Sequence, residues 1–240
     1  MTSAVIDAER LQQVMEATWR TAAASTVGPW TIREGKGGGK RVSAATADGD
    51  WQDTDIPVAE TAMAALGQSA LFVIRAGDDR LDQALMARGY RIVDPVVAYA
   101  APIATLALPP EPMTTFPHWP PMAIAADLWA EGGVGAARLA IMDRVVGPKT
   151  AILSRAQDRA AGIAFVAVHE NIAMLHALEV TTLQRRQGSA HNILRAAAIW
   201  AQANGADTLL VVVTVANDAA RRLYASLAMK VVGQYHYRQK

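Results

Sequence analysis

The amino-acid sequence predicts an α/β protein with two lobes, each a mixed central sheet flanked by helices. Two observations carry this prediction. Short runs rich in β-branched residues alternate with stretches of helical periodicity. A strand–helix–strand pattern also occurs twice, because a shift of 139 positions lays residues 71–78 on 210–217 and residues 89–93 on 228–232 without a gap. We therefore expect two copies of one fold.

The composition narrows the class of protein. Among 240 residues, 52% are hydrophobic and 19% are charged, which is typical of a globular chain with a packed core. The net charge is +1, so no overall field attracts nucleic acid, and an anion needs a local site. The chain has no cysteine, which excludes disulfides, thiolate nucleophiles and Cys-ligated metals.

Neither export nor membrane insertion is predicted. The N-terminal MTSAVIDAER has early acidic residues and no basic stretch before an apolar segment, unlike a signal peptide. The longest apolar stretch, residues 160–168, is about half as long as a membrane span. We therefore expect a cytoplasmic protein that binds neither a membrane nor nucleic acid.

A proline-rich segment divides the chain. Seven of the eleven prolines lie between Pro102 and Pro121, where each removes an amide donor and restricts the residue before it. The predicted organisation is a first domain at residues 1–101, an extended linker at 102–121 and a second domain at 122–240. The part before Pro110 carries a charge of −3 and the rest +4, so function is sought first in the second domain.

The second domain alternates helices and strands, with a meander of three strands in its first half. The run 209–215 is apolar throughout and suits a strand buried on both faces. In chain order we expect a helix at 123–146, strands at 151–156, 162–168 and 172–180, a helix at 191–204, a strand at 209–215, a helix capped by Asn217 and a strand at 230–237.

The second domain also holds the most informative motif. Residues 185–190 read Arg-Arg-Gln-Gly-Ser-Ala and lie between a predicted strand and a predicted helix. Small residues there let backbone N–H groups close around a pyrophosphate at a helix N-terminus, where the helix dipole favours negative charge. The two arginines supply countercharge. Taken alone, the motif fits an ordinary helix entry equally well.

In its context the motif resembles the GNAT superfamily of acyl-coenzyme A-dependent N-acyltransferases. LHALEVTTLQRRQGSAHNIL resembles that family's fourth strand, pyrophosphate loop and third helix, and VANDAARRLYASLAMKVV resembles its fifth strand, tyrosine helix and next strand. GGGKRVSAAT and GQYHYR are similar to bacterial members with a degenerate N-terminal GNAT-like domain. Thr182, Ala190 and the pair Ala228-Met229 depart from the common proline, glycine and Gly-Phe of the pattern.

The resemblance implies how acetyl-CoA, the cosubstrate, is bound. Backbone groups of Leu178 and Val180, on a splayed strand, would pair with the pantetheine arm, and Asn217 would hydrogen-bond near it. The pyrophosphate would lie on the loop made of Arg185, Arg186, Gln187, Gly188, Ser189 and Ala190. Asn217 serves equally as a helix N-cap.

Two side chains are predicted to be catalytic. The resemblance implies that Tyr224 points its hydroxyl at the thioester sulfur, where a phenol can protonate the leaving thiolate; the alternative is a core aromatic. His176, which strand alternation places on the same side as Leu178 and Val180, is a candidate base for the amine, although a lone histidine on an apolar strand is as often structural. Glu179 is expected to point the opposite way.

Other motifs are weaker. The glycine-rich residues 35–40 lack the Lys-Ser/Thr ending of a nucleotide-binding P-loop and are predicted to form a hairpin loop. No metal site is visible, because His169 and Glu170 have no further ligand at a suitable spacing. Trp119 and Trp129 are expected to pack rather than to line a pocket.

The first domain is expected to be chemically silent. The position that matches Gly188 is Gly49, but Asp48 and Asp50 flank it, and their carboxylates would repel a phosphate. Leu85 stands where the second domain has Tyr224. We therefore expect the first domain to shape the acceptor side of the second.

The sequence therefore predicts an acetyl-CoA-dependent N-acetyltransferase that acts by direct transfer on a primary amine of a small molecule or peptide. A double-displacement reaction lacks its nucleophile, since there is no cysteine and no serine with a base beside it. The alternative is a non-catalytic acyl-CoA-binding sensor or scaffold. The sequence leaves a homodimer open and does not name the acceptor.

Overall fold

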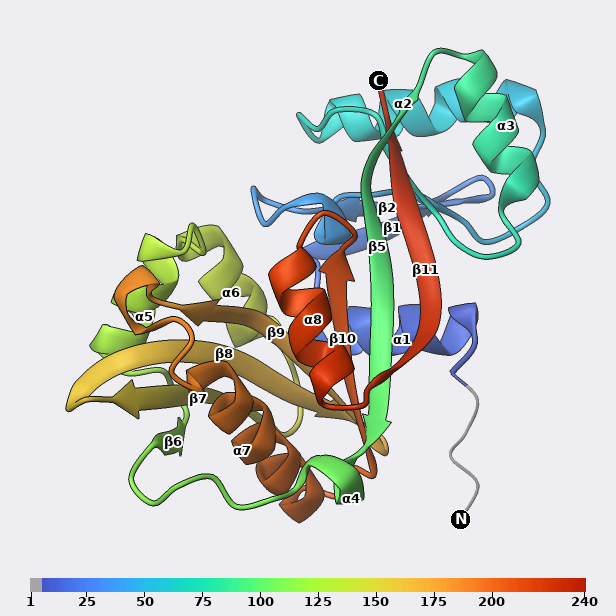
Figure 1. Cartoon of the computed structure of the whole chain (residues 1–240). Helices are drawn as coiled ribbons and strands as arrows, with labels where there is room; N and C mark the ends of the chain where they lie inside the picture. Colours follow the sequence, from blue (N-terminus) through green and yellow to red (C-terminus); the bar gives the residue numbers. More distant parts are fainter. Residues whose placement is uncertain (1–5) are drawn as a thin grey trace.

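A computed structural model describes residues 6–240 and shows one large mixed sheet flanked by helices (Figure 1). The predicted α/β class is confirmed. The sheet has eight strands. In spatial order these are β4 (Leu71–Ile74), β11 (Lys230–Gln239), β5 (Arg91–Pro102), β10 (Thr208–Thr214), β9 (Ile172–Val180), β8 (Arg159–His169), β7 (Lys149–Ala156) and β6 (Thr115–His118).

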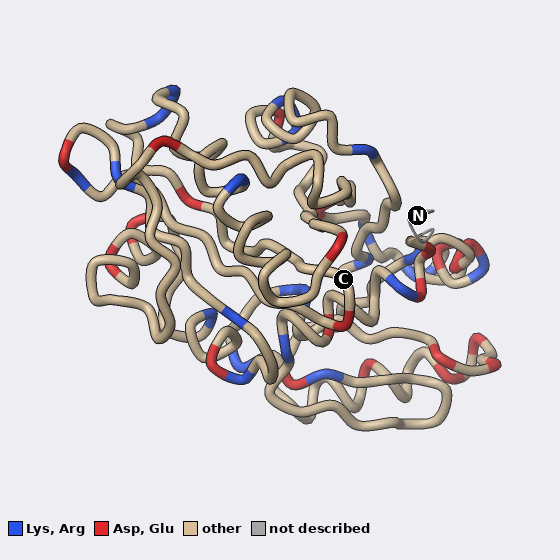
Figure 2. Tube along the Cα trace, turned by 90° about the horizontal axis from the view of Figure 1, so that it is seen from below, with Lys and Arg blue, Asp and Glu red and all other residues tan. Residues whose placement is uncertain are grey.

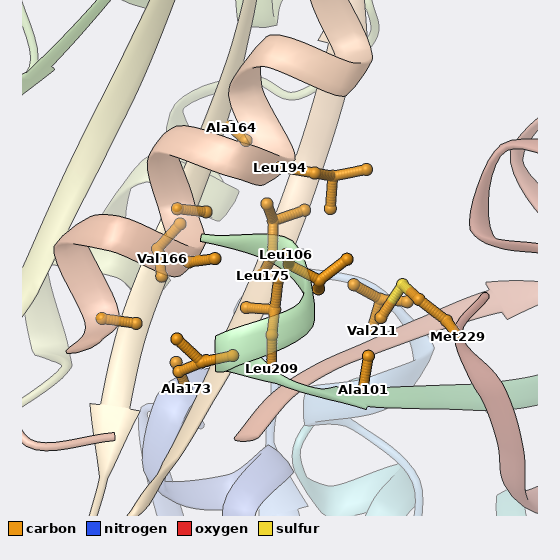
Figure 3. Close-up of a cluster of buried hydrophobic side chains, with 14 of the residues drawn as sticks. Ala101, Leu106, Ala164, Val166, Ala173, Leu175, Leu194, Leu209, Val211 and Met229 are labelled. Atoms are coloured by element: carbon orange, nitrogen blue, oxygen red, sulfur yellow. The ribbon is translucent and has the colours of Figure 1, made fainter. Parts of the chain in front are cut away.

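Helices cover both faces of this sheet. One face packs against α4 (Ile103–Leu106), α7 (Ser189–Ala203) and α8 (Asp218–Ser226) through a core that includes Leu175, Leu194 and Val211 (Figure 3). The other packs against α1 (Ala8–Thr18) and, farther along the sheet, against α5 (Ala123–Glu131) and α6 (Ala136–Arg144). We call these the α7 face and the α1 face.

A smaller antiparallel sheet lies beside the large one. It consists of β1 (Ala23–Val27), β2 (Trp30–Glu34) and β3 (Thr46–Ala47), and a parallel bridge between Ala45 and Phe72 joins it to β4. With α2 (Ile56–Ala65) and α3 (Asp79–Ala87) it encloses a second core that contains the fully buried Trp30, Phe72 and Leu85. The N-terminal part of the chain is therefore well packed.

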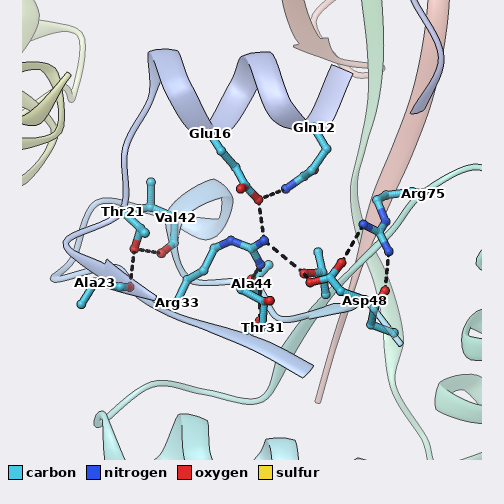
Figure 4. A network of polar contacts seen from close by, with 12 residues as sticks. Gln12, Glu16, Thr21, Ala23, Thr31, Arg33, Val42, Ala44, Asp48 and Arg75 are labelled. Carbon is cyan, nitrogen blue, oxygen red and sulfur yellow. Dashed lines mark hydrogen bonds and ion pairs between the residues drawn. The ribbon is translucent and has the colours of Figure 1, made fainter. Parts of the chain in front are cut away.

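Buried polar contacts fasten α1 to the small sheet (Figure 4). Arg33 on β2 is only 5% exposed, and its guanidinium pairs with Glu16 of α1 and donates to the carbonyl of Ala44 at 2.9 Å. Asp48 pairs with Arg75 nearby, at 3.2 Å. The carboxylate of Asp48 thus has an ion-pair partner within the fold. Elsewhere, charges of both signs are interspersed along the chain (Figure 2).

The repeat found by the 139-position shift is a repeat of structure. The first repeat is β4–α3–β5 and the second is β10–α8–β11. The pairing between strands repeats too, but the first strand of each repeat pairs with the last strand of the other, so that β4 pairs with β11 and β10 with β5. Ile74 of β4 pairs with His236 of β11, and shifting both positions (74 + 139 and 236 − 139) gives Val213 and Val97, which pair in β10 and β5. Each repeat therefore completes the sheet of the other.

This exchange bears on the predicted domain boundaries, which remain a proposal. β5, from the first predicted domain, lies between β10 and β11 of the second. A chain that began near residue 122 would lack this central strand. The predicted linker also contains α4 and the edge strand β6, which pairs with β7; an edge position tolerates Pro117 because one side of the strand needs no amide partner.

The helix predicted at residues 123–146 is two helices. α5 ends at Glu131 and α6 begins at Ala136, and Gly132-Gly133 lie between them. Gly133 has a φ of +80°, in the left-handed region that ends helices. The length prediction was wrong because this glycine pair interrupts an otherwise periodic stretch. No helix within residues 6–240 is long and apolar enough to cross a membrane.

Candidate active site

Two parallel strands separate at the centre of the large sheet. β9 and β10 pair from Ile172 with Thr208 as far as Leu175 with Val211. Beyond this point both strands continue, to Val180 and Thr214, without pairing to each other. A gap therefore opens through the sheet between two strands that are still extended.

The gap holds a cavity of about 440 Å³, which we call the splay cavity. Leu178, Asn217 and Tyr224 line it from the α7 face. His176, Trp19 and Tyr237 line it from the α1 face. The structure thus brings together four residues that the sequence singled out, and the splay cavity is open to groups on both faces of the sheet.

Tyr224 on α8 is buried at the edge of the splay cavity and is 4% exposed. Its ring lies against that of Tyr99, with 5.6 Å between centroids. Burial raises the pKa of Tyr224 to about 12, because the phenolate would lose its hydration. The hydroxyl therefore stays protonated at neutral pH and is able to donate.

Asn217 caps α8, as one of its two predicted roles required. Its side-chain oxygen accepts from the backbone N–H of Ala220 at 3.1 Å. It also lines the splay cavity. Its amide NH₂ group does not take part in the cap, so the cap leaves that donor free for a second contact.

A bulge in β9 changes which way the side chains point. Ala177 has a φ of +49°, and the register with β8 shifts between the pairs His176–Phe165 and Glu179–Ile163. The indole N–H of Trp129 donates to the carbonyl of Ala177 at 2.8 Å. The extra residue interrupts the strict alternation of side chains along the strand.

The prediction that His176 and Leu178 share a side was therefore wrong. His176 stacks on Trp19 toward the α1 face, with 5.0 Å between ring centroids, whereas Leu178 packs against the core of the α7 face. Glu179 lies close to Gly132, between α5 and α6, and lines a small separate cavity. Glu179 was expected on the face of the sheet away from His176. Because of the bulge it lies instead on the face that packs against α5 and α6.

Both ring nitrogens of His176 are occupied. A guanidinium N–H of Arg41 lies 3.0 Å from Nδ1, and Thr18 Oγ1 lies 2.9 Å from Nε2. Because guanidinium only donates, Nδ1 must accept and the proton belongs on Nε2. Burial, reinforced by Arg41, holds the pKa of His176 well below its usual range. The imidazole is neutral and its lone pair is taken, so the predicted role as a base does not fit this geometry.

The backbone of β9 presents groups to the gap. The N–H of Thr181 donates to the carbonyl of Ala161 in β8 at 2.9 Å. Because successive residues of a strand direct their backbone groups to opposite sides, those of Val180 and Leu178 point away from β8, toward the separated β10. The carbonyl of Val180 accepts from the Arg185 side chain at 3.3 Å.

The loop at residues 185–190 leads into α7. Gly188 has a φ of +82°, and no side chain caps the N-terminus of the helix. Two buried polar atoms beside it, Gln184 Oε1 and Ser189 Oγ, have no hydrogen-bond partner among the described residues. Uncapped N–H groups, an unpartnered hydroxyl and two exposed arginines are what a pyrophosphate requires. The loop itself does not line the splay cavity.

Several residues that the sequence analysis passed over also line the splay cavity. Lys40 and Arg41 lie at the end of the glycine-rich stretch, which belongs to the loop between the antiparallel strands β2 and β3 and reaches the cavity. Asp94 enters from β5 with a φ of +44° and pairs with Lys40 at 2.9 Å. The basic pair after three glycines was the available signal, because glycines permit a close approach to another segment.

Comparisons with known proteins agree with this architecture. The model of the acetyltransferase (GNAT) family matches residues 99–229. The chain is 24% identical over 244 residues to the uncharacterised N-acetyltransferase YobR of Bacillus subtilis (strain 168), covering 98% of this chain and 99% of the relative.

Solved structures show the same fold. A GCN5-related N-acetyltransferase from Kribbella flavida superposes with a TM-score of 0.73 at 17% identity, over 97% of this chain and 95% of the other. A conserved protein of unknown function from Staphylococcus epidermidis gives 0.70 at 10% identity, over 96% and 98%. With a family model that matches more than half of it, this chain belongs to the GNAT family of acetyltransferases.

Proposed function

We propose that this acetyltransferase uses acetyl-CoA and acetylates a primary amine of a small molecule or peptide by direct transfer. One observation carries the proposal. The separation of β9 from β10 creates a passage through the sheet, with Tyr224 at its edge. Donor and acceptor can then approach the same point from opposite faces.

The α7 face suits the donor. The loop of Arg185, Arg186, Gln187, Gly188, Ser189 and Ala190 would bind the pyrophosphate through backbone N–H groups, the two arginines and the unpartnered Ser189 hydroxyl. Backbone groups of Leu178 and Val180 would pair with the pantetheine arm in the gap. The side-chain amide of Asn217 would donate to the same arm.

Two groups of the protein would act on the reacting atoms. The Val180 backbone N–H, directed into the gap, would donate to the oxygen on which negative charge develops. Tyr224 would give its proton to the departing thiolate, and its raised pKa keeps that proton in place until it is needed. The proton that the amine nitrogen loses as the amide forms would then restore the Tyr224 hydroxyl through solvent. His176 receives no proton-transfer role, since its only basic nitrogen already accepts from Arg41.

The composition of the splay cavity supports direct transfer. Neither serine nor cysteine is among the described residues that line it. A covalent acetyl-enzyme would need a nucleophile with a base beside it, and the imidazole of His176, which already accepts from Arg41, is not available to activate Thr214, the threonine in the lining. The amine would therefore attack the thioester itself, while both substrates are bound.

The test is thiol release from acetyl-CoA in the presence of a panel of amines, with calorimetry of acetyl-CoA binding beside it. We expect binding at one site per chain and amine-dependent thiol release. Binding without release by any amine would instead support the sensor or scaffold alternative. If acetyl-CoA does not bind at all, the donor site assigned to the α7 face is wrong.

A further inference from the structure

We propose that the acceptor is a small amine that also carries a carboxylate, and that Arg41 binds this carboxylate on the α1 face of the splay cavity. The proposal deepens the function proposed above and rests on it. The observations that carry it are the unmet hydrogen-bond donors of Arg41, the unbalanced positive charge around it and its position on the side of the sheet away from the 185–190 loop.

Arg41 has more donors than partners. A guanidinium carries five N–H groups, and among residues 6–240 this one donates to a single acceptor, Nδ1 of His176. Its Nε is buried and has no partner there. A buried donor without an acceptor is costly unless a ligand or water supplies one. The guanidinium thus has unused donors beside an open cavity.

The contact with His176 holds Arg41 without neutralising it. No carboxylate of the described residues lies within 4.0 Å of the Arg41 side chain, whereas the neighbouring Arg33 and Lys40 pair with Glu16 and Asp94. A neutral imidazole accepts a hydrogen bond and leaves the positive charge intact. The indole of Trp19, whose centroid is 5.7 Å from the guanidinium carbon, adds support without countercharge.

A second arginine strengthens the field. Arg138 of α6 lines the splay cavity, and its guanidinium lies about 4 Å from where a side chain at Gly39 would begin. Burial raises the pKa of Glu179 and the charge of Arg138 opposes this rise, but no ion pair joins the two side chains among the described residues. Around the cavity, three cations face one carboxylate, Asp94, which is already paired. An anionic ligand group would balance this excess.

The position of Arg41 assigns the anion to the acceptor rather than to the phosphates of the donor. Its partner His176 bonds to Thr18 at the end of α1, on the α1 face. The 185–190 loop precedes α7, which packs on the opposite face. A guanidinium binds carboxylate with two parallel hydrogen bonds, and the limited volume, shared with the end of the pantetheine arm, favours a small molecule.

The first test compares acceptors with and without the anion at equal concentrations of the uncharged amine, because removing a neighbouring carboxylate also lowers the pKa of the amine. Thiol release is measured with the wild-type protein for L-amino acids and for their α-amides, and for O-phosphoethanolamine against ethanolamine. We expect kcat/KM to be about tenfold to hundredfold higher for acids than for the amides, the usual range for a charged hydrogen-bonded pair. Equal values would overturn the proposal. A preference for the phosphate alone would reassign the anion as phosphate and overturn the carboxylate.

The second test assigns the preference to Arg41. In Arg41→Gln the acid-to-amide ratio of kcat/KM should fall close to one, mainly through KM for the acid, and Arg41→Lys should restore part of it. Arg80→Gln is the matched control, because Arg80 also lies over a tryptophan ring but does not line the splay cavity. An unchanged ratio in Arg41→Gln would overturn the assignment. Thermal unfolding confirms that each variant is folded.

Binding measurements separate this proposal from the proposed function. If the protein binds acetyl-CoA but acetylates nothing in the panel, calorimetry of amino acids against the protein saturated with coenzyme A decides. Binding of acids but not amides, lost in Arg41→Gln, supports the carboxylate site. Absence of any such binding overturns it, while failure to bind acetyl-CoA counts only against the donor site.

Discussion

The two strand–helix–strand repeats share one backbone plan and differ in what fills it. Leu85 of the first repeat and Tyr224 of the second occupy matching positions on α3 and α8, 139 residues apart. Leu85 is fully buried among Trp30 and Phe72. Tyr224 is nearly as buried, yet its side chain lines the splay cavity.

Helix-to-strand contacts repeat as well. Asp82 of α3 accepts two hydrogen bonds from Arg238 of β11, at 2.7 and 3.0 Å, and another from His236 at 2.7 Å. The matching residues are Arg221 of α8 and Tyr99 of β5, where the guanidinium of Arg221 donates to the Tyr99 hydroxyl and this contact raises the pKa of Arg221. The first repeat is thus locked by an ion pair and the second by a weaker polar contact.

The difference shows how one scaffold gives a closed and an open copy. In the first repeat, β4 is paired to β11 and bridged to Ala45, and apolar side chains fill the space between. In the second, β10 separates from β9 after Val211. Packing closes one copy, and loss of strand pairing opens the other.

The largest expected effect concerns Tyr224. Tyr224→Phe should lower kcat about a hundredfold, since it removes a proton donor for the thiolate while keeping the ring. Affinity for acetyl-CoA, measured by calorimetry, should stay within about twofold. The matching change in the closed copy, Leu85→Met, should leave kcat unchanged. Equal kcat in Tyr224→Phe and wild type would make Tyr224 a packing residue.

The next effect is on stability. Asp82→Ala leaves the buried guanidinium of Arg238 without its carboxylate and should cost about 2 kcal/mol of unfolding free energy. Arg221→Ala, the matching change in the second repeat, should cost less, because Arg221 is more exposed and its contacts are the neutral Tyr99 hydroxyl and an exposed ion pair with Asp218. Urea unfolding of both variants measures the difference. A larger loss in Arg221→Ala would contradict the comparison.

Local pattern was sufficient to predict strands β7 to β11, the repeat and the helix that carries Tyr224, but not the edge strand β6. Sequence pattern could not predict the bulge at Ala177, because nothing in the residue types around it indicates that an alanine adopts a positive φ. That one residue placed Leu178 on the face opposite His176. The exchange of β5 and β11 and the reach of Arg41 into the splay cavity depend on contacts between distant segments, which periodicity does not report.

A smaller effect is expected at the two matching glycines. Gly188→Val should weaken coenzyme A binding about tenfold, because a β-branched residue is strained at a φ of +82° and narrows the approach to α7. Gly49, its counterpart in the first repeat, lies on the exposed surface, and Gly49→Val should leave binding unchanged. Calorimetry with coenzyme A compares them. Unchanged affinity in Gly188→Val would remove the loop from the donor site.

The smallest expected effect is a pH dependence confined to the first repeat. Hydrogen bonds from Arg238, and then from His236, lower the pKa of Asp82 in the folded protein, although partial burial opposes them. A carboxyl whose folded pKa is below its unfolded value, about 3.9, contributes stability that is complete above that pH and disappears as pH falls through the folded pKa.

The stability difference between wild type and Asp82→Asn should therefore shrink between about pH 5 and pH 2, by about 1 kcal/mol once solvent screening of this partly exposed group is allowed for. The second repeat offers the control, because the matching contact joins Arg221 to the hydroxyl of Tyr99 and contains no carboxylate. The difference between wild type and Tyr99→Phe should accordingly vary much less with pH. Urea unfolding of the three proteins across this range measures both differences. A constant difference for Asp82→Asn would mean that its carboxyl is not held by Arg238, and that the ion pair does not distinguish the closed repeat from the open one.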